Sequence, residues 1–423
     1  MNSVTFVEGK RFFIDGTQTI ATAADLEGNK IVPAMTILID GSTGGSSEGW
    51  AWAFIASPVV ENIAPTAVDN LVGNVIPETN PVEYDFDLYR LNPASVVWEN
   101  YNDPAYHDGF NLVNGQGYLN TTMGTKTLVF HGTYNTGTEM EIENLPQGFN
   151  LLGNPFVVDA YANRTYYKMN AAGDDIEIVE NYAENPIPAC TGVVVKAETA
   201  GESVTFSTEV PQPSANNGNL QMTLINSGAK SDPFQDKAIL SFNESDKLEK
   251  FIFNERRAKL YIPQNGNDYA IAYSESQGEV PLNFEAKENG EFSLTVNPEG
   301  VDMLYLHLID NMTAADIDLL QTPTYTFTAK TSDYASRFRL IYAAQFSVGD
   351  EETDPPFAFN SNGNWIIPND GEATLQVIDL NGRILSSETI NGCVSKAINA
   401  AAGLYILRLI NGKEVRTQKI VVR

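Results

Sequence analysis

The last sixty-seven residues, Phe357 to Arg423, contain three Asn-Gly pairs between apolar runs, and this pattern limits the fold more than any other feature. The pairs are Asn381-Gly382, Asn391-Gly392 and Asn411-Gly412. Both residue types tolerate positive φ, which a two-residue type I′ turn requires at its two central positions. The flanking runs, such as Leu404 to Ile410, are apolar and rich in β-formers. The stretch is therefore predicted to be a small antiparallel β-sandwich.

Several motifs occur in order within this stretch and end at the last residue. They are Val377-Ile378-Asp379, Asn381-Gly382-Arg383, Ala402-Gly403-Leu404-Tyr405 and Gln418 to Arg423. With them the stretch resembles the C-terminal sorting domain of type IX secretion substrates. On this resemblance the sorting motif comprises Asp379, Gly382, Arg383, Gly403, Tyr405 and Lys419. The alternative is a plain β-sandwich with a similar pattern.

The resemblance implies an immunoglobulin-like sandwich that is docked by the type IX secretion machinery. Such a domain directs export across the outer membrane of a Bacteroidota bacterium, and it is usually cleaved off. The cargo is often attached to surface lipopolysaccharide. We therefore expect a secreted protein or one on the outer-membrane surface.

The charge is strongly negative and unevenly distributed. The chain has 423 residues and a formal net charge of −28. Residues 357–423 hold seven Lys and Arg against five Asp and Glu, a net charge of +2, so the remaining residues carry −30. An acidic surface repels phosphates and anionic lipid, so nucleic acid and membrane are not expected partners. No apolar run approaches a membrane span.

Cysteine usage and the N-terminal residues add two expectations. The only cysteines are Cys190 and Cys393, which excludes a disulfide framework, and each is expected to be a single, partly buried thiol. Residues 1–16 lack the apolar core of a signal peptide. Because a type IX substrate first crosses the inner membrane, we expect this chain to be part of a longer protein.

Residues 46–211 are predicted to form one β-domain made of a duplicated unit, with half-units at about 50–133 and 148–211. Four apolar segments of the first copy recur in the same order in the second. The matched pairs are Trp52–Val59 with Phe149–Phe156, Asp87–Asn92 with Thr165–Asn170, Gly115–Leu119 with Cys190–Val195, and Thr127–Phe130 with Ser203–Phe206. Two such halves are expected to close against each other, because a lone four-stranded sheet would expose one apolar face.

The duplicated region resembles a domain of secreted Bacteroidota proteins in which "SPV" and "GNPF" segments head two related halves. The match lies at Ser57-Pro58-Val59, Asp87 to Arg90, Asn114 to Tyr118 and Gly153 to Phe156. The resemblance implies no catalytic residues. Pro81 to Asp85 lies in a loop that the second copy lacks, a place where binding residues could lie.

The rest of the chain is also predicted to be β-structure. Residues 1–45 contain short β-like runs that belong either to an upstream domain or to the next one. Residues 219–345 hold six apolar strands and resemble the β-sandwich that often precedes a sorting domain. Segments 41–47, 211–218 and 346–356 are expected to be linkers. The predicted fold class is thus all-β, with several antiparallel β-sandwiches.

The sequence contains no recognisable catalytic constellation. The three histidines, His107, His131 and His307, share no metal-binding spacing, and His307 is expected to be a packed residue with one hydrogen bond. Acidic pairs such as Asp174-Asp175 match no calcium loop and are interpreted as solvated loop charge. There is no nucleotide fingerprint. We therefore expect no enzyme activity, no metal and no cofactor.

The candidate binding residues are the aromatics of the first half-unit. Trp98, Tyr101 and Tyr106 are predicted ligand-binding aromatics, and the first two are expected to be exposed because polar residues flank them, whereas Trp52 is expected to fill the core. The expected function is adhesin-like binding of a host protein or glycan. The alternative is an accessory or carbohydrate-binding C-terminal portion of a larger secreted hydrolase.

Overall fold

The computed structural model describes most of the chain after residue 50. The described ranges are 51–77, 82–211, 218–229, 232–345, 357–361, 364–369, 371–412 and 414–422. Five strands before residue 41 are described as well: β1 (Phe12–Ile14), β2 (Gln18–Ile20), β3 (Leu26–Glu27), β4 (Lys30–Ile31) and β5 (Met35–Asp40). Strands make up 56% of the chain and helices 3%, which confirms the predicted all-β class.

The chain forms two compact units. Unit 1 consists of residues 1–215 and 245–256, and unit 2 consists of residues 216–244 and 257–423. The predicted linkers 41–47 and 346–356, and residues 212–217 of the linker 211–218, lie outside the described residues. No helix in the described ranges is long and apolar enough to cross a membrane.

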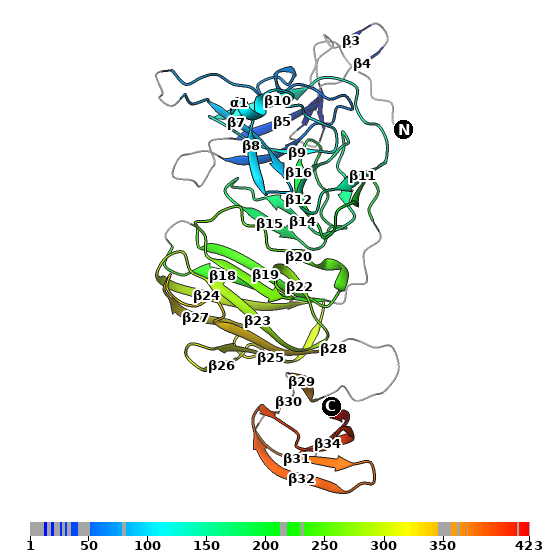
Figure 1. Cartoon of the computed structure of the whole chain (residues 1–423), viewed down its shortest axis with the longest axis vertical. Coiled ribbons are helices and arrows are strands. Elements are labelled where there is room, and N and C mark those ends of the chain that lie inside the picture. The colour runs from blue at the N-terminus through cyan, green and yellow to red at the C-terminus, as the bar shows by residue number, and fades with distance from the viewer. Residues whose placement is uncertain are drawn as a thin grey trace. The chain divides into compact units, whose positions relative to one another are not determined.

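Unit 1 is built from two halves with the same strand order (Figure 1). In the first half, a sheet has the order β6-β9-β7-β8, and β10 pairs with β5. In the second half, a sheet has the order β12-β16-β14-β15, and β17 pairs with β11. The first-half strands are β6 (Trp52–Ala56), β7 (Phe86–Asn92), β8 (Val97–Asn100), β9 (Gly117–Thr122) and β10 (Thr125–Phe130). The second-half strands are β11 (Glu139–Leu145), β12 (Gly148–Gly153), β14 (Tyr166–Met169), β15 (Ile176–Val179), β16 (Gly192–Ala197) and β17 (Glu202–Ser207), and β13 (Tyr161–Ala162) also pairs with β17.

Unit 1 has two apolar cores, each on one face of a four-stranded sheet, and the first also contains Ala189 and Cys190 of the second half. Alternate residues of a strand point to opposite faces. In β9, Tyr118 belongs to the first core, together with Phe86 and Leu128. In β16, Val193 and Val195 belong to the second core. The sheets therefore bury one face within their own half, and the other faces approach each other.

The two sheets meet through a reciprocal pair of backbone hydrogen bonds. Ala56 N donates to Cys190 O at 2.9 Å, and Gly153 N donates to Gly115 O at 2.9 Å. Ala56 and Gly153 occupy equivalent positions at the ends of β6 and β12, and Gly115 and Cys190 both precede the central strand of their sheet. The two bonds are thus related by the duplication, which makes unit 1 a pseudo-symmetric pair of halves.

Close backbone approach at this junction requires a small residue. A Cβ atom added to Gly153 would lie 2.5 Å from the Ala56 Cβ and 2.7 Å from Gln116 O. Both distances are well below van der Waals contact, so a side chain at position 153 would push the halves apart.

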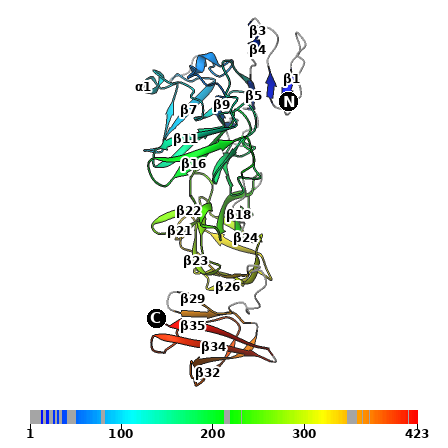
Figure 2. The ribbon, with the colours of Figure 1, turned by 90° about the vertical axis from the view of Figure 1, so that its right-hand side faces the viewer.

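Residues 219–345 of unit 2 form a sheet that folds over one core (Figure 2). The strand order is β26-β25-β28-β23-β21-β22-β19-β18-β24-β27. The strands are β18 (Asn219–Asn226), β19 (Phe234–Ser241), β21 (Lys259–Gln264), β22 (Asn267–Tyr273), β23 (Gln277–Glu285), β24 (Gly290–Glu299), β25 (Asp302–Asp310), β26 (Ala315–Asp318), β27 (Thr324–Ala329) and β28 (Phe338–Gln345). Strands from both ends of this order, such as β24 and β25, contribute to the same core.

The C-terminal module, residues 357–423, contains two sheets. One has the order β29-β30-β33 and the other the order β32-β31-β34-β35. The strands are β29 (Phe359–Ser361), β30 (Asn364–Ile367), β31 (Glu372–Asp379), β32 (Ile384–Asn391), β33 (Val394–Lys396), β34 (Gly403–Asn411) and β35 (Glu414–Val422). Their core includes Trp365, Leu375, Leu407 and Ile420. This is the predicted two-sheet sandwich, while its immunoglobulin-like detail stays a prediction.

The Asn-Gly turns differ in part from the expectation. The glycines have φ values of 83°, 66° and 60°, at Gly382, Gly392 and Gly412. Positive φ at both residues, as type I′ requires, occurs instead at Asn265-Gly266 in unit 2, with φ values of 53° and 87°. Asn391-Gly392 connects β32 to β33, which lie in different sheets, so this pair is a crossover between sheets and not a hairpin.

Candidate functional site

The Asp379 carboxylate organises the turn between β31 and β32. Its Oδ1 accepts hydrogen bonds from Arg383 N at 2.9 Å and Asn381 N at 3.0 Å, and Arg383 Nε lies 3.2 Å from Oδ2. The backbone N–H of Arg383 is the main reason that the pKa of Asp379 lies below its usual range. Gly382 completes the turn in the left-handed region. The predicted motif residues Asp379, Gly382 and Arg383 therefore form one hydrogen-bonded, charged turn, in which Arg383 is exposed.

The remaining motif residues lie on strands beside this turn. Tyr405 in β34 pairs with Asp379 in β31, and its Oη donates to Ala401 O at 2.8 Å. Gly403 begins β34 and pairs with Val422. Lys419 in β35 pairs with Ile406 and is exposed. Five of the six motif residues thus lie at one end of the sheet. The sixth, Lys419, pairs with Ile406, the residue that follows Tyr405 in β34.

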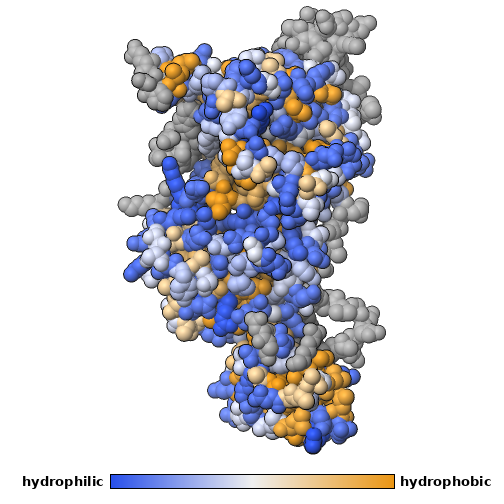
Figure 3. Space-filling model, in the orientation of Figure 1, coloured by the Kyte–Doolittle hydropathy of each residue, from blue (hydrophilic) through white to orange (hydrophobic). Residues whose placement is uncertain are grey.

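The outer face of this sheet carries a row of apolar side chains, four of them exposed and Ile378 buried, that the sequence reasoning missed. Across the strands, Ile378 pairs with Ile384 and Ile406, and Leu404 pairs with Val421, so these residues share a face. We define the outer apolar face as these residues together with Leu380. Exposed fractions are 62% for Leu380, 56% for Val421, 47% for Ile384 and 40% for Leu404. Figure 3 shows hydrophobic residues gathered on the surface of this module.

A signal for this face was present in the sequence. Leu404 to Ile410 is apolar on both parities, whereas a strand with one wet face alternates apolar and polar residues. The odd positions Leu407 and Leu409 fill the core, and the even positions Leu404 and Ile406 lie on the outer apolar face. A contiguous exposed apolar patch of this kind is typical of a surface that binds another protein.

The C-terminal module matches a known family. Residues 360–423 match the family described as the secretion system C-terminal sorting domain. The C-terminal module is therefore a type IX secretion sorting domain, and the protein is exported to the cell surface or the extracellular space. The secretion machinery is thus a partner of the chain.

Two further comparisons give less. No curated protein matches the chain. Among solved structures, the chain is similar to one described as "Biofilm associated protein - BSP domain", with 11% identity and a TM-score of 0.17, over 100% of this chain and 98% of that chain. A score this low carries no argument about fold or function.

The predicted ligand-binding aromatics of unit 1 occupy different environments. Trp98 in β8 and Tyr106 in the short helix α1 (Pro104–His107) are half-buried. Tyr101 is only 7% exposed, and its ring packs against Phe86 and Phe110 in the first core. The expectation that Tyr101 is exposed is therefore wrong. The reason is that Tyr101 follows β8 at a position where the chain turns its ring inward, although its neighbours in the sequence are polar.

The three histidines are separate from one another. His107 Nδ1 lies 3.0 Å from Tyr101 O, and His131 Nε2 lies 3.1 Å from Asp69 Oδ2. His307 Nδ1 lies 2.6 Å from Asp316 Oδ1, and its ring stacks on Tyr305 at 4.1 Å. This confirms that His307 is a packed residue with one hydrogen bond. Within the described ranges no group of three or more His, Cys, Asp or Glu side chains is placed to hold a metal ion.

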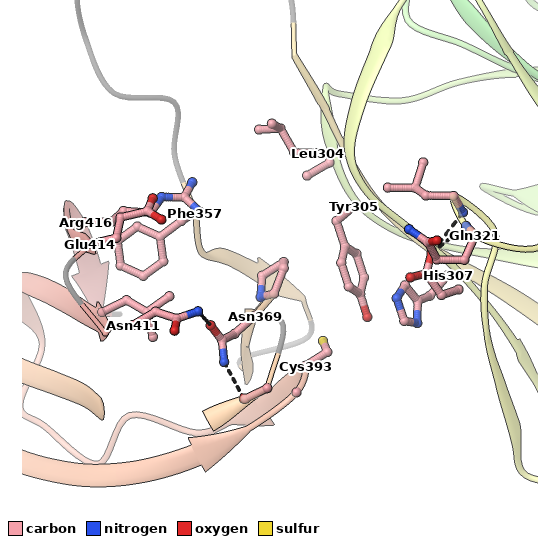
Figure 4. A pocket seen from close by; sticks show the side chains of 17 residues that line it. Leu304, Tyr305, His307, Gln321, Phe357, Asn369, Cys393, Asn411, Glu414 and Arg416 are labelled. Carbon is pink, nitrogen blue, oxygen red and sulfur yellow. Dashed lines mark hydrogen bonds between the residues drawn. The ribbon is translucent and has the colours of Figure 1, made fainter. Parts of the chain in front are cut away.

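A cavity of about 470 Å³ lies in unit 2 beside β25 (Figure 4). Tyr305 and His307 line it from β25, and Phe357, Asn369 and Arg416 line it from the sorting domain. The Arg416 guanidinium lies over the Phe357 ring, 5.2 Å from its centre. The residues of the sorting motif do not line this cavity, so it is distinct from the charged turn.

Cys190 and Cys393 are both free thiols, as expected. Cys190 is fully buried and Cys393 is half-buried. Burial raises the pKa of both thiols above the usual value for cysteine. Neither thiol is therefore activated as a nucleophile at neutral pH.

Proposed function

We propose that this exported chain is a non-catalytic surface protein that binds a host protein or glycan through the first half of unit 1. The observation that carries the proposal is the turn between β7 and β8. Val96 in this turn has a φ of 53° and is 47% exposed, and Val97 beside it is 46% exposed. A β-branched residue at positive φ is strained, and strained exposed residues cluster at binding sites.

The neighbourhood of this turn supports the proposal. β8 is the terminal strand of its sheet, and a terminal strand can accept an added strand from a partner. Trp98 follows the two valines directly and is half-buried, so part of a large aromatic surface is available beside them. The turn is apolar, whereas residues 1–356 carry a net charge of −30.

The absence of catalysis is part of the same proposal. Its support is that His131 and His307 belong to different units and are each engaged with a single aspartate. General acid–base chemistry needs such a group beside a second reacting group in one site.

Binding can be tested by screening the full chain on glycan arrays and on immobilised matrix proteins, together with the variant Val96→Asn/Val97→Thr. Asn tolerates positive φ, so the variant should fold and keep its melting temperature. We expect a saturable hit that weakens at least tenfold in the variant. The matched control is Val60→Thr, which changes another exposed valine of the first half, 52% exposed, and should bind normally. Equally strong binding by the wild type, the double variant and Val60→Thr would refute the proposal that the ligand binds at Val96 and Val97.

We also infer that the secretion machinery contacts the outer apolar face of the sorting domain. Replacing two of its residues, Leu404→Asn and Val421→Thr, leaves the core untouched because both side chains are exposed. We expect the variant to accumulate in the periplasm, as measured by fractionation and surface labelling of the producing cells. Val415→Thr is the control, since Val415 is 55% exposed at the opposite end of β35. Normal surface display of the double variant would refute the inference.

A further inference from the structure

Residues 245–256 belong to unit 1 although unit 2 precedes and follows them in the sequence. We call this segment the strap. It lies between β19 and β21, both strands of unit 2, and it contains β20 (Leu248–Glu249). Its sequence is SDKLEKFIFNER, in which two phenylalanines are separated by one residue. The strap is therefore a sequence insertion that belongs to unit 1, although its strand β20 pairs with β22.

The two strap phenylalanines contact both halves of the duplicated domain. Phe251 packs against Phe149, with ring centres 4.8 Å apart, and against Tyr167 at 6.1 Å. Phe253 meets Phe54 at 6.1 Å and Trp98 at 6.4 Å, edge to face in both cases. We define the aromatic face as Phe54 and Trp98 of the first half with Phe149 and Tyr167 of the second. The strap thus bridges the two halves through alternate side chains.

Polar contacts fix the strap backbone at the same place. Tyr167 Oη donates to Glu249 O at 2.7 Å and accepts from Phe251 N at 3.2 Å. Asn254 Nδ2 donates to Asp174 O at 3.1 Å. Lys196, whose ammonium lies 5.0 Å from the centre of the Phe149 ring, pairs with the Glu249 carboxylate. One tyrosine hydroxyl therefore binds the backbone on both sides of Lys250.

This is how a protein holds an extended peptide. Main-chain hydrogen bonds fix the peptide, and alternate side chains enter apolar sites on one face. Ile252, between the two phenylalanines, is 38% exposed and so points away from the aromatic face. The two apolar cores of unit 1 contain no strap residue, and the buried strap side chains Leu248 and Phe251, 1% and 5% exposed, lie outside them.

We propose that the aromatic face is a binding site for an extended peptide with aromatic side chains two positions apart, and that the strap is its displaceable occupant in cis. The proposal shares Trp98 with the surface beside Val96 and Val97 but rests on the contacts of the strap. When the strap leaves, Phe54, Trp98, Phe149 and Tyr167 become available to a Phe-x-Phe segment of another chain. A partner with that chemistry competes with the strap.

The test uses the full chain and a fluorescein-labelled peptide of residues 245–256, followed by fluorescence anisotropy. In the variant Phe251→Ala/Phe253→Ala the strap no longer fills its site, and we expect the added peptide to bind at least tenfold more tightly than to the wild type. A peptide in which both phenylalanines are alanine should not bind. Ile252→Ala is the matched control, because it alters the strap without emptying the site, and it should behave like the wild type.

Several outcomes would overturn the proposal. Equal binding of the peptide to the wild type and to the double variant would show that binding does not depend on strap displacement. A folded double variant that fails to bind the peptide would show that the aromatic face is no peptide site. The single variant Phe253→Ala removes only the half-buried ring and should give an intermediate affinity. If neither variant folds, the strap is a core element of unit 1 and the proposal fails.

Discussion

The two halves of unit 1 share one strand order but use different residues at equivalent points. At the end of the first strand, one half has Ser57-Pro58-Val59 and the other Asn154-Pro155-Phe156. In both cases the polar side chain accepts a hydrogen bond from the backbone two residues on, at 3.2 Å for Ser57 and 2.9 Å for Asn154. The backbone thus requires a side chain that accepts a hydrogen bond at this position, and either serine or asparagine can supply it.

The turn before the central strand repeats this lesson. Gly115 has a φ of 86°, and its counterpart Cys190 has a φ of 60°. Glycine adopts this conformation without strain, whereas a residue with a Cβ pays roughly 1–2 kcal/mol for it. Cys190 is fully buried in the first core, and the apolar contacts of its thiol offset that strain. The halves therefore keep backbone geometry and differ in how side chains support it.

The largest expected difference between the halves lies at Asn154. Its amide nitrogen also donates to Val158 O at 2.9 Å and Ile187 O at 2.8 Å, so three backbone groups depend on this fully buried side chain. Asn154→Ala should cost unit 1 roughly 3 kcal/mol, because each buried group left unpaired costs about 1–3 kcal/mol. Ser57→Ala, which orphans one group, should cost about 1 kcal/mol.

The measurement for this pair is urea unfolding followed by tryptophan fluorescence. Trp50, Trp52 and Trp98 lie in unit 1, so substituting Trp365 by Phe leaves a signal from unit 1 alone. Asn62→Ala, at an exposed position, serves as the control for a lost amide. Equal losses at positions 57 and 154 would mean that the halves are more alike than their hydrogen bonds indicate.

A somewhat smaller effect is expected at the junction of the halves. Gly153→Ala places a Cβ against both Ala56 and Gln116 O, and such overpacking typically costs about 1–3 kcal/mol. Adding Ala56→Gly removes one of the two collisions, so the double variant should recover part of the loss in the same fluorescence assay. If the two losses simply add, the contact between positions 56 and 153 does not hold the halves together.

Much of the duplicated fold could be predicted because it depends on local pattern. Apolar segments such as Trp52–Ala56 and Gly192–Ala197 are largely buried strands. Buried strands consist mostly of apolar residues, and a run of apolar residues is easily recognised in a sequence. Each half nevertheless includes one strand outside the predicted half-units, Met35–Asp40 and Glu139–Leu145. The second of these is largely charged and exposed, so its pairing with β17 leaves little hydrophobic signal.

The candidate sites were predicted less completely, for a physical reason. The turn at Asp379 is made by residues within four positions of each other, so a short motif contains it. The strap is different, because Phe251 and Phe253 meet rings about 100 to 200 positions earlier in the sequence. Tyr101 likewise takes its environment from Phe110 and not from its polar neighbours. Local sequence cannot fix contacts that only the closed fold creates.

The smallest expected effect concerns one position that is charged in the second half and apolar in the first. Glu198 follows β16, whereas the equivalent position after β9 is Met123. Burial, and next to it the negative charge of Glu249, raises the pKa of Glu198 above 4.5. A raised carboxyl pKa means that the folded state favours the protonated form. This contribution to stability is therefore complete below pH 4.5 and is lost as the pH rises through the raised pKa.

Glu198→Gln should remove this dependence, because glutamine resembles the protonated acid at every pH. We expect the melting temperature of unit 1 in the variant to vary less than that of the wild type as the pH rises from 4.5 to 7. Glu209→Gln, at an exposed position, is the control and should leave the wild-type profile unchanged. An unchanged profile in Glu198→Gln would place the pH dependence elsewhere. The pair Glu198 and Glu249 would then not distinguish the second half from the first.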